Sequence, residues 1–158
     1  MHAGERFNSI THLVGAVMSV VGLATLVTMG ALQGDAYKVV SFGVYGAMLC
    51  VLYAISTLYH SVRRPRLKAV LQKCDHSAIY LLIAGSYTPF TLVTLRGPWG
   101  WSLFGVSWGL AVLGIVQELT LGRRTRVVSM VLYVVMTVLP LAPLRSLACP
   151  GGLDWPGR

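Results

Sequence analysis

Apolar residues in this chain fall into five blocks, and short polar connectors separate the blocks. A helix that crosses a bilayer needs about 20 mostly apolar residues, and each block is close to this length. Lipid offers no hydrogen-bond partner to backbone polar groups, so segments of this kind cross it as helices. The pattern therefore predicts five membrane spans, over residues 13–32, 39–60, 77–95, 101–119 and 127–144.

The predicted fold class is an all-α membrane protein, with its spans packed as one transmembrane helical bundle over residues 1–144. The connectors are too short to hold a soluble domain. Pro140 and Pro143 interrupt the last block, and further proline and glycine residues follow them. We therefore expect residues 145–158 to form an irregular tail.

The composition supports a location in the cell membrane. Apolar residues make up 55% of the chain and charged residues 11%, whereas a typical soluble domain is about 25% charged. The mean hydropathy is +0.68. These values exclude a disordered chain and leave too little polar surface to cover a water-soluble globule. Three widely spaced cysteines also exclude a disulfide-stapled secreted module.

The net charge is strongly positive, with 13 Lys and Arg residues against five acids and a formal value of +8. Most of the bases lie in the second and fourth connectors, a placement typical of cytoplasmic loops, so the N-terminus is predicted to be cytoplasmic as well. Bases at the ends of spans favour contact with anionic membrane lipids, and we expect no binding of nucleic acid. These residues are Arg63, Arg64, Arg66, Lys68 and Lys73 in the second connector and Arg123, Arg124 and Arg126 in the fourth.

Polar side chains of the first two spans collect at their cytoplasmic ends. Glu5, Asn8 and His12 are spaced i, i+3 and i+7, which places them on one face of a helix that enters the first span. Ser56 and His60 share a face at the cytoplasmic end of the second span. Polar groups in a membrane are costly, so their common level indicates a site.

The third and fourth spans add carboxylates and a further imidazole at the same level. Asp75 and His76 open the third span, and Glu118 closes the fourth. Each residue also has an ordinary interpretation, with Asp75 as a helix cap and Glu118 as an interfacial acid beside Arg123. Taken together, carboxylate, imidazole and hydroxyl groups from separate helices favour a shared site over a chance arrangement.

Such a set of groups is typical of a metal site. Neutral imidazole is the commonest metal ligand, and nearby Ser and Asp side chains orient a ligand or a bound water. A catalytic zinc ion keeps three protein ligands and one open position for water. The chain has four histidines, at positions 2, 12, 60 and 76, and a complete set of three ligands is not evident from the sequence.

The motifs that carry these residues are Glu5-x2-Asn8-x3-His12, Ser56-x3-His60 and then Asp75. In this order they resemble the first two signature motifs of the haemolysin III family. That family is related to the adiponectin and progestin receptors, a superfamily with seven spans and a cytoplasmic N-terminus. Residues 84–90 are similar to the third span of the family, and the resemblance covers roughly residues 5–136.

The resemblance implies a zinc ion within the cytoplasmic leaflet. It implies that His60 is a zinc ligand, that Asp75 holds the metal-bound water and that Ser56 lies beside the site. The first motif then has a supporting role. The other two zinc ligands of the family form an HxxxH pair on the seventh span, and this sequence contains no HxxxH.

The resemblance therefore implies a chain with five helices of a seven-helix bundle, shortened or frame-disrupted after about Met136, and with an incomplete zinc site. His12 and His76 are the imidazoles that remain to replace the missing ligands.

Three functions follow as hypotheses. By the resemblance, the chain is a zinc-dependent membrane hydrolase of a lipid amide or ester, with Asp75 and Ser56 in the catalytic site. The alternatives are a haemolysin-like membrane protein and a non-catalytic role in membrane homeostasis or signalling. A transporter is disfavoured, because no span carries an acid or a base at the membrane midplane.

Overall fold

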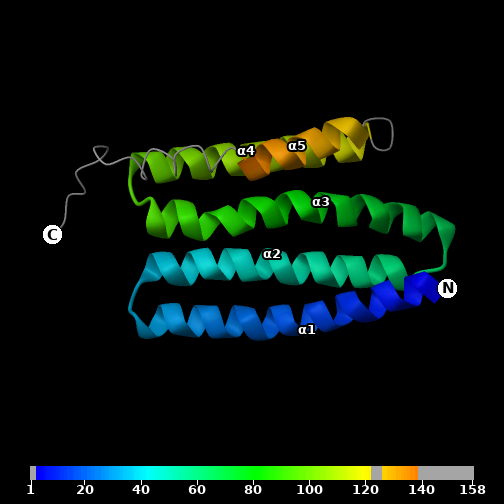
Figure 1. Cartoon of the computed structure of the whole chain (residues 1–158), viewed down its shortest axis with the longest axis horizontal. Coiled ribbons are helices and arrows are strands. Elements are labelled where there is room, and N and C mark those ends of the chain that lie inside the picture. The colour runs from blue at the N-terminus through cyan, green and yellow to red at the C-terminus, as the bar shows by residue number, and fades with distance from the viewer. Residues whose placement is uncertain (1–2, 122–125, 139–158) are drawn as a thin grey trace.

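Residues 3–121 and 126–138 are described by a computed structural model, in which they form five α-helices and one π-helical turn (Figure 1). Figure 1 shows α1, α2, α3 and α4 side by side in a row, with successive helices running in opposite directions. The last helix, α5, packs against α4 and α3. The elements are α1 (Ala3–Leu32), α2 (Ala36–Ser61), α3 (Pro65–Pro89), η1 (Phe90–Thr94), α4 (Pro98–Thr120) and α5 (Arg126–Val138).

Four of these helical segments are long and apolar enough to cross a membrane, which confirms the predicted all-α membrane architecture. The fifth predicted span begins as α5, a shorter apolar helix that the structure describes as far as Val138. Residues 139–144 of that span and the predicted tail lie outside the described residues. The four segments are Glu5–Leu32, Ala36–Ser61, Pro65–Thr94 and Pro98–Thr120.

Two helices extend well beyond the predicted apolar spans. The first begins at Ala3, so the whole Glu5–His12 motif is helical. The third begins at Pro65, and the basic residues that follow lie on a helix rather than in a connector. An apolar block marks only the residues that lie in the hydrocarbon layer. A helix can continue past that layer into the headgroup region, so it can be longer than the apolar block. Proline suits the first helical position, because the N–H that it lacks has no partner there.

The third span changes its helical form at Pro89. Proline has no N–H to donate, and the chain continues from it as the π-helical turn η1. Hydroxyl groups supply hydrogen bonds around this point: Thr88 Oγ1 donates to the Ala84 carbonyl at 3.0 Å, and Thr91 Oγ1 lies 3.1 Å from the Tyr87 carbonyl. Trp108 Nε1 on α4 donates to Thr88 Oγ1 at 3.3 Å, which joins the two helices at this level.

The packed core lies among α3, α4 and α5. Tyr80, Ala84, Ala111 and Met136 are buried together, and Tyr80 is fully enclosed. Gly114 makes this packing possible, because a Cβ atom at that position would lie 2.4 Å from Tyr80 Cε1. The close approach of α3 and α4 brings polar side chains at their ends into contact.

The end of the bundle that holds the α1–α2 and α3–α4 turns is here called the Arg96 end. Asp35 caps α2 by accepting hydrogen bonds from the backbone N–H groups of Tyr37, at 3.0 Å, and Lys38, at 3.4 Å. Its other oxygen pairs with the Arg96 guanidinium, which lies 5.0 Å from the centre of the Tyr37 ring. Because Asp35 and Arg96 belong to different turns, the pair joins the two turns.

These interactions control the ionisation of Asp35. Desolvation alone would raise its pKa, but the hydrogen bond and charge of Arg96 and the two backbone N–H groups outweigh desolvation and lower the pKa of this carboxyl.

Candidate functional site

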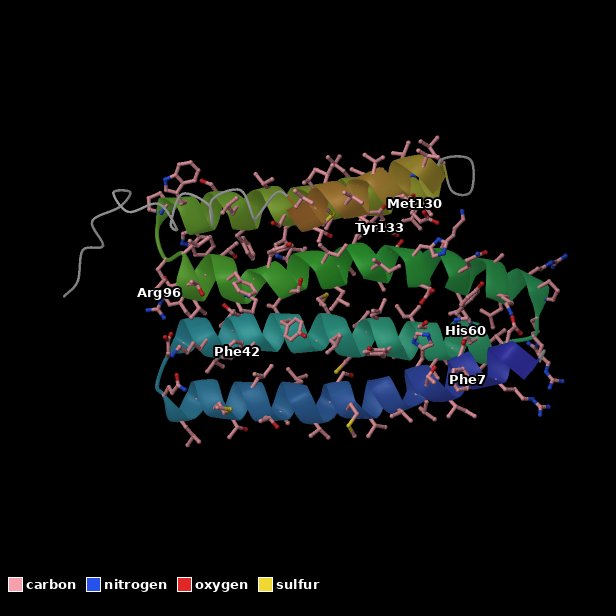
Figure 2. The ribbon with its side chains drawn as sticks, in the orientation of Figure 1. Phe7, Phe42, His60, Arg96, Met130 and Tyr133 are labelled. Carbon is pink, nitrogen blue, oxygen red and sulfur yellow. The ribbon has the colours of Figure 1, made fainter. Side chains whose placement is uncertain are left out.

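The polar residues selected from the sequence lie at the other end of the bundle. This end, here called the basic end, carries the exposed side chains of Arg63, Arg64, Arg66 and Lys73. Figure 2 shows His60 close to this end and Arg96 at the far end. The antiparallel order of the helices therefore brings the start of α1, the end of α2 and the start of α3 together, as the sequence predicts.

Two histidines from adjacent helices form the centre of the site. The rings of His12 on α1 and His60 on α2 are stacked, with centroids 5.4 Å apart and planes at 8°. Aromatic rings hold both in place, because Tyr53 lies 5.9 Å from His12 and Tyr59 meets His60 edge-on at 4.8 Å. The sequence places these histidines at one level, and the structure makes them neighbours.

Both imidazoles have unused hydrogen-bonding capacity. The Nδ1 atoms of His12 and His60 are buried and have no hydrogen-bond partner among the described residues. A buried polar atom without a partner destabilises a fold by about 1–3 kcal/mol, so native proteins rarely leave one unpaired. Because the two atoms lie in one stacked pair, this pair is a candidate position for a further group.

Asp75 and Ser56 lie at the same end of the bundle as this pair. Ser56 is one helical turn before His60 on α2 and is 4% exposed. Asp75 is half-buried on α3, and its carboxylate, like that of Glu5, is within electrostatic range of the His60 ring. The structure thus brings hydroxyl, carboxylate and imidazole groups from three helices to one level.

The first motif ties α1 to its neighbours. Glu5 forms an ion pair with Lys68 on α3, and the Lys68 ammonium lies 5.4 Å from the centre of the Tyr59 ring. Ser9 Oγ and Ser61 Oγ are hydrogen-bonded at 2.8 Å. These contacts are consistent with a supporting role for the motif.

Asn8 departs from the expected cluster. Its side chain is exposed, while its backbone carbonyl accepts a hydrogen bond from Thr11 Oγ1 at 2.9 Å. At 3.6 residues per turn, His12 lies about 20° around the helix from Glu5, whereas Asn8 lies about 60° from Glu5 in the same direction, beyond His12. That difference turns Asn8 out of the contact between α1 and α2.

A second polar cluster joins α3 to α4 and α5. His76 Nδ1 lies 2.9 Å from Glu118 Oε1, and Glu118 is only 6% exposed. Ser129 Oγ on α5 lies 3.4 Å from the other Glu118 oxygen, and the Tyr133 hydroxyl donates to the His76 carbonyl at 3.2 Å. His76 therefore faces α4, on the side of α3 away from the stacked histidines.

The interpretation of Glu118 as an interfacial acid beside Arg123 needs correction, because Glu118 is buried and bonded to His76. Arg123 itself lies outside the described residues. The partner of Glu118 stands 42 positions earlier in the chain, so no local spacing signals the pair.

The described residues do not provide a full set of zinc ligands. Within residues 3–121 and 126–138, no group of three or more His, Cys, Asp or Glu side chains is placed to hold a metal ion. A catalytic zinc ion takes three protein ligands. The Nδ1 atoms of His12 and His60, which have no partner among the described residues, suit a metal, but the HxxxH pair that the resemblance implies is missing from the sequence.

The fold and the polar end together define a multi-pass, all-α membrane protein with histidine and carboxylate groups gathered at one end of its spans. A family model described as "Haemolysin-III related" matches residues 2–154, and the chain belongs to this family. The match reaches further toward the C-terminus than the resemblance that the motifs indicate, which covers roughly residues 5–136.

Individual relatives show the same relationship. The chain is 44% identical over 143 residues to Hemolysin-3 of Bacillus cereus, an alignment that covers 90% of this chain and 65% of that protein. It is 40% identical over 143 residues to the Hemolysin-3 homolog of Bacillus subtilis, with 90% and 67% covered. It is 28% identical over 152 residues to the human Monocyte to macrophage differentiation factor, with 93% and 63% covered.

The alignment to the Bacillus cereus relative therefore spans just under two thirds of that protein. No solved structure matches the chain significantly.

Proposed function

We propose that this haemolysin III family protein carries part of a zinc site at the cytoplasmic end of its bundle. The observation that supports the proposal is the stacked pair of His12 and His60, whose two Nδ1 atoms are buried with no hydrogen-bond partner in the part of the chain that the structure describes. Neutral imidazole is the form that binds metals, and Asp75 stands within electrostatic range to offset the charge of a cation.

The finer form of this proposal is hydrolysis of a lipid amide or ester. A zinc ion with a full set of ligands would supply a water molecule that ionises near neutral pH, which is the chemistry that such hydrolysis needs. The described residues hold too few ligands to support a hydrolytic step by themselves. We therefore propose metal binding by this chain, with hydrolysis dependent on ligands beyond the described residues.

Zinc content is the direct test. The purified full chain in detergent micelles is dialysed to equilibrium against buffer that contains zinc, and the excess of zinc on the protein side is measured by atomic emission. We expect weak binding that His60→Ala abolishes, because an incomplete set of ligands holds the ion loosely. His12→Ala should also reduce binding.

His76→Ala is the matched control, because it removes an imidazole from the same end of the bundle but from the pair with Glu118. Its zinc content should equal that of the unmodified chain. Equal zinc content in the His60→Ala and His76→Ala variants would contradict the proposal. A non-catalytic role in membrane homeostasis or signalling would then explain the family fold better.

A second proposed property is contact with anionic lipid at the basic end. Arg63, Arg64 and Arg66 are exposed and form no ion pair with a described carboxylate, and exposed Leu67 and Val70 follow them on α3. Cations beside apolar side chains suit the headgroup layer, where lipid phosphates supply the missing negative charge.

A further inference from the structure

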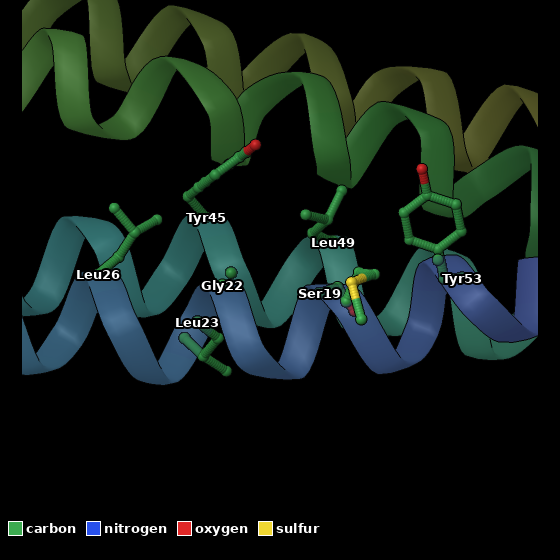
Figure 3. Close-up of a pocket in the computed structure, with 10 residues that line it drawn as sticks. Ser19, Gly22, Leu23, Leu26, Tyr45, Leu49 and Tyr53 are labelled. Carbon is green, nitrogen blue, oxygen red and sulfur yellow. The ribbon is translucent and has the colours of Figure 1, made fainter.

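A groove between α1 and α2 runs through the apolar part of the bundle (Figure 3). Its volume is about 270 Å³. The only hydroxyl on its α1 wall, that of Ser19, is already occupied, since it donates to the Ala16 carbonyl at 2.7 Å and to Cys50 Sγ at 3.2 Å. The surface of the groove is otherwise mostly apolar. Its walls include Gly15, Ser19, Gly22, Leu26, Tyr45 and Tyr53.

The length of the groove corresponds to one leaflet of a bilayer. Its α1 wall runs from Gly15 to Leu26, about 16 Å at a rise of about 1.5 Å per residue. Its α2 wall, from Tyr45 to Tyr53, spans about 12 Å by the same measure. The hydrocarbon core of a bilayer is about 30 Å thick, so one leaflet contributes about 15 Å.

One end of the groove is formed by Tyr53, whose ring lies next to the stacked histidines. Tyr53, which forms the end of the α2 wall, lies 5.9 Å from the His12 ring. His12 in turn stacks on His60. A molecule in the groove would therefore have its apolar part between the helices and its polar part at the level of the two imidazoles.

Gly22 lines the groove, and no described neighbour packs closely enough to require a glycine at this position. A Cβ atom added to Gly22 would meet nothing within 4 Å, in contrast to Gly15, where it would lie 2.6 Å from Tyr53 Cε1. Because glycine has no side chain, the groove stays open at this position.

We propose that this groove seats one acyl chain of a lipid in the cytoplasmic leaflet, with the polar group of that lipid beside His12 and His60. A volume of about 270 Å³ holds about nine groups of water size, which suits a single chain better than a bulky ring system. The placement of the polar group depends on the function proposed for the histidine pair, whereas the seating of the chain does not.

Photolabelling tests the groove directly. The full chain is reconstituted in phosphatidylcholine vesicles with a long-chain fatty acid that carries a diazirine near the middle of its chain. After irradiation, labelled peptides are identified by mass spectrometry. We expect labelling to concentrate on α1 between Gly15 and Leu26 and on α2 between Tyr45 and Tyr53. Even labelling of all lipid-exposed helix faces in the unmodified protein would overturn the proposal.

Gly22→Leu should reduce labelling of the groove at least about fourfold, the change expected when one methylene group is excluded. Gly109→Leu is the matched control, because a Cβ there also meets nothing within 4 Å and the residue lies on α4. Its labelling should match that of the unmodified chain. Should Gly22→Leu fail to fold, Leu26→Trp narrows the same groove from another position, and unchanged labelling in the folded variant would overturn the proposal.

His60→Ala separates this inference from the proposed metal site. If both proposals hold, this variant loses bound zinc, and its photolabel still concentrates on the residues that line the groove. Loss of zinc without any concentration of label in the groove would overturn the acyl-chain seat alone. A labelled groove in a chain that binds no zinc would overturn the metal site alone.

Discussion

The two ends of the bundle differ in whether their charged side chains are paired within the chain. At the Arg96 end, Asp35 caps α2 and pairs with Arg96, while Lys38 donates to the Gln33 side chain. At the basic end, exposed arginines have no described carboxylate partner, and two buried imidazole nitrogens have no hydrogen-bond partner among the described residues. At the Arg96 end the charges of Asp35 and Arg96 are thus paired within the chain, whereas the basic end has cations and imidazoles that can still bind molecules outside the chain.

This difference shows where function is to be sought in a chain with few polar groups. A matched pair such as Asp35 and Arg96 joins two turns and needs nothing more. An unmatched group beside lipid is unfavourable unless a ligand, an ion or a headgroup compensates it. Three variants test the contrast, each changing one kind of matched or unmatched charge.

The largest expected effect concerns the unmatched arginines. Replacing Arg63, Arg64 and Arg66 together with Gln should lower the preference for phosphatidylglycerol over phosphatidylcholine by about fivefold per residue, since each such cation contributes about 1 kcal/mol at an anionic surface. The ratio of the two lipids that copurify from mixed vesicles measures this preference. Lys38→Gln at the Arg96 end is the control and should leave the ratio unchanged, and a fall in the control as large as in the triple variant would contradict the contrast.

The next effect concerns the buried carboxylate of Glu118. Glu118→Ala should lower the free energy of unfolding by about 2 kcal/mol, because His76 and Ser129 then lose a buried acceptor. Unfolding of the purified chain in detergent micelles measures the loss. Glu118→Gln keeps an acceptor oxygen in nearly the same shape and should lose less, so equal stability of all three proteins would show that the pair has no role in joining α3 to α4.

The smallest effect concerns Asp35, which is matched but near the surface. The pKa of Asp35 is lower in the folded chain than its ordinary value of 3.8. Its contribution to the free energy of unfolding is therefore complete above pH 3.8 and disappears as the pH falls through the lower pKa of the folded chain. Asp35→Asn should therefore lower the thermal unfolding temperature slightly at neutral pH and have no effect well below pH 3.8. Arg96→Gln should show the same pH dependence, and a difference that persists in acid would rule out the ion pair as its cause.

Much of the fold could be predicted from the apolar blocks, because the requirement for about 20 apolar residues per span is local. The helices α1 to α4 follow it, and the antiparallel order that places Glu5, Ser56 and Asp75 at one end needs only short connectors. The start of α3 at Pro65 could not be read in this way, since hydropathy does not report helical residues outside the hydrocarbon layer.

The composition of the site was only partly predictable. The i, i+3, i+7 spacing of the first motif predicts one shared face, yet Asn8 is exposed while Glu5 and His12 contact other helices. How far a contact surface extends around a helix depends on how its neighbour packs against it. The pairing of His76 with Glu118 depends in the same way on the close contact between α3 and α4 at Gly114.

The sequence by itself determined that this protein is a bundle of membrane helices with its polar residues at one level, because both properties follow from hydropathy and from residue counts along each span. Only the tertiary structure decided that His12 stacks on His60, that Glu118 is buried against His76, and that a groove beside Gly22 ends at Tyr53, which lies next to His12. These features depend on the rotation of each helix about its axis and on the distance to its neighbour, which side-chain packing sets and which no local pattern records.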